Sequence, residues 1–115
     1  MMLDNDTIAV ISSPQGQGAI SIIRISGDKT HKVLERIITP KFKEIKYSDL
    51  KKNRNYLGII QYKNEIIDEV MISKLKKPNS FTGEDMAEIF CHGSIYIQNR
   101  IMKLLIDNGV RTANP

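Results

Sequence analysis

The sequence predicts an α+β domain in which a mixed β-sheet packs against helices. Three observations support this class. Runs of β-branched residues follow one another near the N-terminus, a short polar turn joins two further runs, and apolar residues recur at helical spacing in two segments. Because strands follow strands instead of alternating regularly with helices, we expect antiparallel pairs and not a doubly wound parallel sheet.

The first quarter of the chain predicts two strands and a short helix. Residues 7–13 (TIAVISS) and 19–26 (AISIIRIS) are β-branched runs separated by the turn at 14–18. Asp28 can act as a helix N-cap, and Pro40 ends the helical pattern. The apolar positions at helical spacing are Val33, Leu34, Ile37 and Ile38.

The middle of the chain predicts a long connection followed by a hairpin. Residues 41–55 are polar, and strands are expected at 56–62 and 66–75. They are joined at 63–65, where Asn64 can adopt the left-handed turn conformation.

The last third predicts a strand, a helix and an edge strand. The strand covers 86–91 and the helix 94–108, with the pair Asn108-Gly109 as its C-terminal stop. Residues 110–113 then return as an edge strand. The apolar stripe of the helix contains Ile97, Ile101, Leu104 and Leu105.

Composition favours one domain over residues 1–115 in a reducing cytosol. Of the 115 residues, 41% are hydrophobic and 26% are charged, a balance typical of globular proteins. No apolar run is long enough to cross a bilayer, and the N-terminus lacks the pattern of a secretory signal. The single cysteine, Cys91, excludes an internal disulfide framework.

The net charge of +4 comes partly from a basic cluster in the long connection. A solvated surface explains such a cluster, and an electrostatic contact with RNA phosphates is the alternative. The cluster matches no nucleic-acid-binding signature. Its members are Lys41, Lys43, Lys46, Lys51, Lys52 and Arg54.

Two motifs that suggest chemistry have simpler explanations. Gly16-Gln17-Gly18 precedes a strand and not a helix N-terminus, which favours a tight strand connection over a phosphate loop. Cys91 and His92 are strand neighbours that point to opposite faces, so we expect a buried free cysteine and no nucleophile–base pair. One cysteine with His31 and His92 also falls short of a zinc site.

Arg24 and Glu88 are the charged residues that need an explanation. Arg24 shares a strand face with Ile20 and Ile22, so it needs either an acidic partner such as Asp68, Glu69 or Glu84, or an anionic ligand. Glu88 lies between Met86 and Phe90 on its own face. Its carboxylate can pair with Arg24, or it can accept two parallel N–H bonds from a flat heterocycle such as a pterin or guanine.

Residues 77–94 are the most informative part of the sequence. Pro78 and Asn79 open a turn and Gly83 permits positive φ, so the backbone before the strand at 86–91 is shaped by residue choice. The segments DTIAVISSPQGQGAISIIRISG and KPNSFTGEDMAEIFCHG, followed by a helix and GVRTANP, resemble the N-terminal domain of the tRNA-modification GTPases MnmE, also called TrmE. The resemblance covers essentially the whole chain.

The resemblance implies a folate-binding, homodimerising domain related in fold to the tetrahydrofolate-binding domains of the aminomethyltransferase and YgfZ type. Its ligand would be 5-formyl- or 5,10-methylene-tetrahydrofolate, bound near the dimer interface. The complete family protein would work with the flavoprotein MnmG on C5 of the wobble uridine of tRNA. GTP, magnesium and potassium would belong to that full-length protein.

Residue by residue, Arg24 matches the arginine of the family's I-I-R-I-S-G strand and Glu88 the last glutamate of T-G-E-D-x-x-E. The resemblance implies that both contact folate, with Glu88 on the donor edge of the pterin. Candidate rim residues of the pocket are Asn79, Ser80, Thr82, Gly83 and His92.

The chain also departs from the family pattern. Residues 14–19 read PQGQGA where members commonly read P-P-G-R-G-G, which removes a basic residue from the loop. The sequence stops at Pro115, so we expect the helical and GTPase domains, and GTP hydrolysis with them, to be absent from it. An interaction module without a small-molecule ligand and direct tRNA binding through 41–54 are the alternatives.

Overall fold

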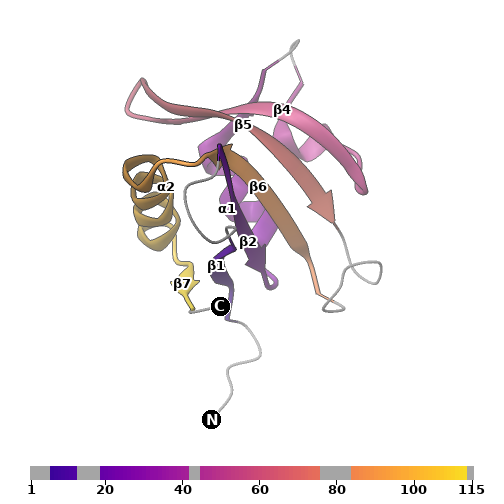
Figure 1. Ribbon diagram of the computed structural model, residues 1–115. Helices are drawn as coiled ribbons and strands as arrows, with labels where there is room; N and C mark the ends of the chain where they lie inside the picture. The colour runs from indigo at the N-terminus through magenta and orange to yellow at the C-terminus, as the bar shows by residue number, and fades with distance from the viewer. Residues whose placement is uncertain (1–5, 13–18, 42–44, 76–83, 114–115) are drawn as a thin grey trace.

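The described part of the chain forms a seven-stranded sheet with two α-helices (Figure 1). The computed structural model describes residues 6–12, 19–41, 45–75 and 84–113. The strand order is β3-β4-β5-β6-β2-β1-β7. The strands are β1 Ile8–Ser12, β2 Ile20–Ser26, β3 Ile38–Pro40, β4 Arg54–Tyr62, β5 Glu65–Leu75, β6 Met86–His92 and β7 Arg111–Thr112. The helices are α1 Thr30–Ile37, α2 Ile95–Asp107 and a 3-10 turn, η1, at Tyr47–Asp49.

The predicted α+β class is confirmed, and so are the antiparallel pairs. Four neighbouring pairs in the sheet centre, β4–β5, β5–β6, β6–β2 and β2–β1, are antiparallel. The hairpin between β4 and β5 turns at Lys63 and Asn64, whose φ values are 50° and 65°. Two left-handed residues suit the twist of adjoining strands, so the turn is one residue shorter than expected and Glu65 already belongs to β5.

The prediction that Asp28 caps the first helix is wrong. The N-cap is Lys29, and its backbone N–H donates to Thr7 Oγ1 at 3.0 Å. Thr7, just before β1, thus accepts a hydrogen bond from a backbone N–H that has no partner within the helix. The helix also ends one residue early, because Ile38 belongs to β3 and pairs with Ile60 of β4.

The second helix follows the prediction closely. Ser94 caps it by accepting a hydrogen bond from the Ile97 N–H at 3.3 Å. Gly109, with φ of 96°, reverses the chain after the last turn. The strand β7 then pairs parallel to β1 and forms the sheet edge.

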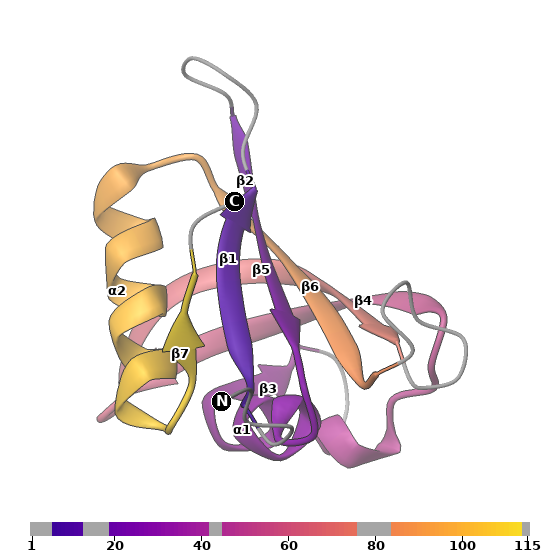
Figure 2. The same ribbon diagram turned by 90° about the horizontal axis from the view of Figure 1, so that it is seen from below.

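Both helices pack against the same face of the sheet. Buried residues of α1 and α2, including Leu34 and Leu105, join one hydrophobic cluster with Ile23, Ile72 and Ile89 from the central strands. Figures 1 and 2 show the curled sheet with α1 behind it and α2 along one side. Side chains at the alternate strand positions therefore lie on a face that no described helix covers, which we call the open face.

The long connection at 41–55 is more ordered than predicted. It contains η1, whose Tyr47 is 2% exposed, and the adjacent Leu50 is also buried. The strand β4 begins at Arg54, two residues before the predicted position. Among the described residues, no helix is long and apolar enough to cross a membrane.

Candidate functional site

Arg24 and Glu88 face each other in the middle of the open face. They are direct register partners on β2 and β6, and Arg24 Nε donates to Glu88 Oε2 at 2.6 Å. The Arg24 side chain is 47% exposed, whereas that of Glu88 is 14% exposed. The arginine thus closes the pair from the solvent side, and the carboxylate lies deeper in the sheet surface.

The bond between them leaves hydrogen-bonding capacity on both partners. Within the described ranges, Glu88 Oε1 and the two terminal guanidinium nitrogens of Arg24 have no further protein partner. A carboxylate has about four acceptor sites and a guanidinium five donors, so one bond uses a small part of either group. The pair can therefore hold a planar ligand that offers N–H donors to Glu88.

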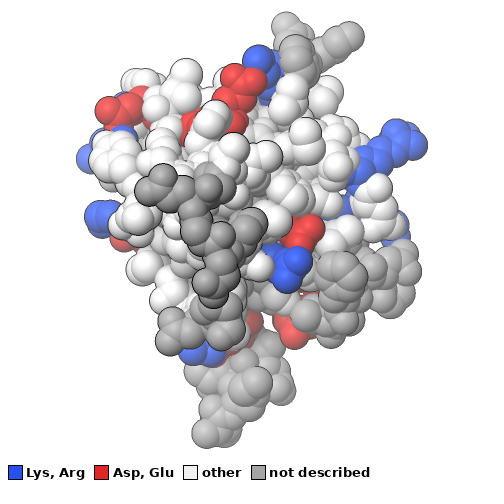
Figure 3. Space-filling view, in the orientation of Figure 1, with Lys and Arg blue, Asp and Glu red and all other residues white. Residues whose placement is uncertain are grey.

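Apolar side chains border this pair along the strands. Phe90 and Ile22 are register partners two residues away on β6 and β2, and Phe90 also pairs with Met71 of β5. Leu57 of β4 continues the row as the partner of Met71. In the space-filling view of Figure 3, uncharged side chains cover most of the described surface around the few acidic and basic groups. The charged pair thus lies beside an apolar row that can pack against an aromatic ligand.

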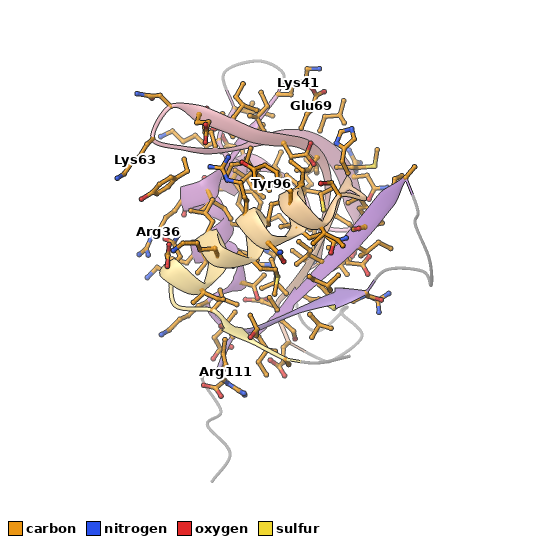
Figure 4. All side chains as sticks on the ribbon, turned by 60° about the vertical axis from the view of Figure 1, so that its left-hand side comes forward. Arg36, Lys41, Lys63, Glu69, Tyr96 and Arg111 are labelled. Atoms are coloured by element: carbon orange, nitrogen blue, oxygen red, sulfur yellow. The ribbon has the colours of Figure 1, made fainter. Side chains whose placement is uncertain are left out.

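The internal partners first considered for Arg24 were wrong. Asp68 accepts from His92. Glu69 accepts from Lys41 Nζ at 2.5 Å, and Figure 4 labels these two side chains. The ion pair that forms is the one between Arg24 and Glu88, which was considered above as one of the two explanations for the glutamate. Antiparallel register explains this choice, because it brings Arg24 and Glu88 into direct opposition.

Cys91 and His92 lie on opposite faces, as predicted. Cys91 is 3% exposed and belongs to the core cluster, whereas His92 lies on the exposed side of β6. Burial, with a smaller effect of the Asp68 charge, raises the pKa of the Cys91 thiol to about 11. The cysteine is therefore a protonated core residue and not an activated nucleophile.

His92 is held by a buried carboxylate that sequence reasoning did not assign to it. Asp68 is 8% exposed; its Oδ1 lies 2.6 Å from His92 Nδ1, and its Oδ2 accepts from the His92 backbone N–H at 2.9 Å. Asp68 has the same strand parity as Val70 and Ile72, and this parity was the available signal that it points inward.

A hollow of about 400 Å³ is lined by His92 and by part of the apolar row. It opens on the same face as the Arg24–Glu88 pair, at the C-terminal end of β6. Its lining is Ala19, Ile20, Met71, Phe90 and Cys91, with Glu69 and His92 as its polar members.

A second buried polar cluster supports the sheet from the helix side. His31 Nε2 lies 2.7 Å from the Leu75 carbonyl oxygen and Nδ1 lies 2.9 Å from the Tyr47 hydroxyl. Since a carbonyl only accepts, Nε2 carries the proton there, and in the neutral ring Tyr47 donates to Nδ1. Burial, followed by the charges of Asp85 and Glu35, raises the pKa of Tyr47.

Several predicted residues lie outside the described part of the chain. These are the rim candidates Asn79, Ser80, Thr82 and Gly83, the Gly16-Gln17-Gly18 turn, and Lys43 of the basic cluster. The other members of that cluster are exposed to solvent. In the described ranges, no three His, Cys, Asp or Glu side chains come together as metal ligands.

Comparison with known proteins supplies the family. Residues 7–115 match the family described as "GTP-binding protein TrmE N-terminus". The chain belongs to this family. The TrmE N-terminal match spans every element of the fold, from β1 to β7.

Proteins named "tRNA modification GTPase MnmE" are among the relatives. The one from Acetivibrio thermocellus is 44% identical over 117 residues, which cover 99% of this chain and 25% of the relative. Those from Fervidobacterium nodosum and Flavobacterium johnsoniae are 46% and 43% identical, over 96% and 98% of this chain and 24% of each relative. The chain thus spans about a quarter of the length of these TrmE proteins.

Proposed function

We propose that this chain binds a tetrahydrofolate derivative, 5-formyl- or 5,10-methylene-tetrahydrofolate, on the open face of its sheet. Glu88 accepts N–H bonds from the pterin ring, and Arg24 contributes charge and further donors at the same place. The observation that supports this most directly is the register pair itself, in which a nearly buried carboxylate keeps an acceptor atom available beside a half-exposed arginine.

The alternative explanation is that Arg24 and Glu88 only stabilise the sheet. An ion pair exposed on one side contributes about 0–1 kcal/mol, so stability gives little reason to place charges among Ile22, Met71 and Phe90. A ligand gives a better reason. A pterin is flat, carries adjacent N–H donors and packs well on apolar side chains, which matches both the charge and the surroundings.

In this proposal the chain is the folate domain of a cytoplasmic tRNA-modifying GTPase. We assign the remaining family activities, GTP hydrolysis with magnesium and potassium and modification of C5 of the wobble uridine together with MnmG, to the complete family protein. Membership of the TrmE N-terminal family supports this placement.

Isothermal titration of 5-formyltetrahydrofolate into the purified chain tests the proposal. We expect saturable binding by the parent and at least tenfold weaker binding by Glu88→Ala and by Arg24→Ala. Glu65→Ala is the matched control, because it also removes an ion-paired carboxylate, from the hairpin end of β5. Equal affinity for the parent and both site variants would refute the site.

We also propose that the chain forms a homodimer. Apolar side chains exposed on the open face, including Leu57 and Met71, support an association of sheet faces, because lone monomers rarely expose contiguous apolar surface. Sedimentation equilibrium at rising concentration should show a dimer that Leu57→Lys weakens. A monomer throughout the concentration range would contradict this proposal.

Direct tRNA contact is the second candidate, favoured by the exposed basic side chains of the 41–54 segment. Lys46, Lys51, Lys52 and Arg54 are all exposed. Phosphate contacts would make binding fall steeply with salt, whereas folate binding through one carboxylate would not. A filter-binding assay with tRNA at about 50 and 200 mM salt would separate the two.

A further inference from the structure

Asn108 and Gly109 form the only Asn-Gly pair in the sequence. Asparagine is among the chemically labile residues of proteins, and a following glycine makes it more reactive, because glycine has no side chain to hinder attack by its backbone nitrogen. The pair lies where α2 ends and the chain turns toward β7, and Figure 2 shows β7 between α2 and β1. Asn108 is half-buried and Gly109 is exposed, so water reaches the pair.

Hydrogen bonds hold both reacting groups of this pair in the folded domain. The side-chain amide nitrogen of Asn108, Nδ2, donates to the Leu104 carbonyl oxygen at 2.8 Å. The Gly109 nitrogen, which would be the nucleophile, donates to the Ile106 carbonyl oxygen at 3.0 Å. A ψ angle of 14° at Asn108 also points the Gly109 nitrogen away from the Asn108 Cβ. Attack on the side chain therefore requires the turn to open.

The residues that follow the turn hold it closed. Val110 is 3% exposed, and its N–H donates to the Leu105 carbonyl oxygen at 3.0 Å. The next backbone donors join β7 to β1. Because β7 has two residues and forms the sheet edge, its pairing can open locally while the central strands stay paired.

We propose that Asn108 is a site of spontaneous deamidation whose rate is set by local opening of the turn between α2 and β7. In the open state, the Gly109 nitrogen attacks Asn108 Cγ, and the new C–N bond closes a five-membered succinimide ring. The bond between Cγ and Nδ2 breaks, and Nδ2 leaves as ammonia with the proton of the Gly109 amide. Water then adds to either carbonyl of the ring and reopens it as aspartate or isoaspartate.

Neither product can rebuild the original turn. A carboxylate only accepts, so the bond to the Leu104 carbonyl oxygen is lost, and a negative charge appears at the C-terminal end of α2, where the helix dipole disfavours it. Isoaspartate also adds one carbon to the backbone before Gly109, which shifts Val110 from its core position. Deamidation therefore weakens the pairing of β7 with β1.

Peptide mass spectrometry of the purified chain measures the reaction directly. The chain is incubated in mildly alkaline buffer, either folded or unfolded by guanidinium chloride, and the peptide that contains Asn108 is followed over time. Chromatography separates the aspartate and isoaspartate products. We expect conversion to be at least tenfold slower in the folded chain. Equal rates would show that the fold does not protect the pair, and no conversion in the unfolded chain would rule out the site.

Val110→Ala and Val70→Ala separate local opening from global unfolding. Both remove the same atoms from core positions, but Val70 lies on β5, away from the turn. Val110→Ala should speed deamidation of the folded chain at least threefold, whereas Val70→Ala should change it little. Equal acceleration by both variants would contradict local opening. Arg111→Ala, which removes the exposed ion pair of β7 with Asp6, is a milder second variant and should also speed the reaction.

Hydrogen exchange tests the consequence for β7. In the deamidated chain, the backbone N–H groups of Arg111 and Ala113 should lose protection at least tenfold, while those of β6 keep theirs. Asn108→Gln is the control for incubation, because glutamine would have to close a larger ring and reacts more slowly, so its exchange should not change. Unchanged protection of β7 in the deamidated parent would show that the reaction leaves the turn intact.

Discussion

Lys74 lies beneath Tyr47 in the interior of the domain. Its Nζ is 4.7 Å from the centre of the Tyr47 ring and donates to the carbonyl oxygens of Tyr47 and Leu50 at 3.2 and 3.1 Å. The lysine is 6% exposed. A buried cation thus fixes the η1 segment to β5, directly before the chain leaves the sheet at Leu75.

Lys74→Met should destabilise the domain by about 2 kcal/mol. The substitution preserves much of the apolar stem but leaves two carbonyl oxygens without their donor, and a buried unsatisfied polar group costs about 1–3 kcal/mol. Urea unfolding followed by circular dichroism measures the change. Lys103→Met, on the exposed face of α2, is the control and should shift stability by less than about 0.5 kcal/mol. Equal effects of the two variants would show that the Lys74 contacts contribute nothing.

Gly27→Ala should be more harmful than Gly109→Ala. Both glycines have positive φ, 135° and 96°, so a side chain strains either one. A Cβ at Gly27 would also lie 2.6 Å from the Asp6 carbonyl oxygen, whereas a Cβ at Gly109 meets nothing within 4 Å. We expect a loss of about 1 kcal/mol at Gly109 and clearly more at Gly27 by urea unfolding. A smaller loss at Gly27 would mean that the start of β1 moves aside readily.

Stability should fall as the pH rises from about 9 to about 11. The folded domain holds the Cys91 proton up to a pKa of about 11, whereas the unfolded chain releases it near the ordinary cysteine value. The unfolded state therefore binds fewer protons in this window, and the free energy of unfolding decreases by at most about 1.4 kcal/mol per pH unit. Cys91→Ala should have a flatter profile than the parent. Identical profiles would show that the thiol does not titrate differently in the two states.

Removing the Arg24–Glu88 bond should change folding stability little. The arginine is half exposed, and exposed pairs contribute about 0.2–1 kcal/mol. Glu88→Gln and Arg24→Ala should therefore each shift the free energy of unfolding by less than about 1 kcal/mol in urea. A loss well above 2 kcal/mol would show that the pair stabilises the fold. A change in the ligand affinity of either variant would then not identify a contact with the ligand.

Local sequence signals predicted most of the secondary structure. The β-branched runs, the Asn64 turn, the Ser94 start and the Gly109 stop each act over a few residues, and each appears where the pattern indicated. The error at Asp28 has a different cause. The donor at the start of α1 is satisfied by Thr7, 22 residues away, and no local capping rule contains that contact.

The residues of the site could be predicted from the sequence, but the contacts between them could not. Sequence patterning indicated that Arg24 and Glu88 needed partners, but only the register of β2 against β6 makes them each other's partner. The buried positions of Asp68 and Lys74 were missed because charged residues are usually assigned to the surface. Their parity with Val70 and Ile72 on β5 marked them as inward-facing, and this alternation was the stronger signal.

The most direct test of the account is a crystal structure of the chain with bound 5-formyltetrahydrofolate. We predict that the pterin donors lie within hydrogen-bond distance of Glu88, with Arg24 beside the ring. A structure in which Arg24 and Glu88 keep their 2.6 Å bond, with folate bound elsewhere, would contradict the central claim.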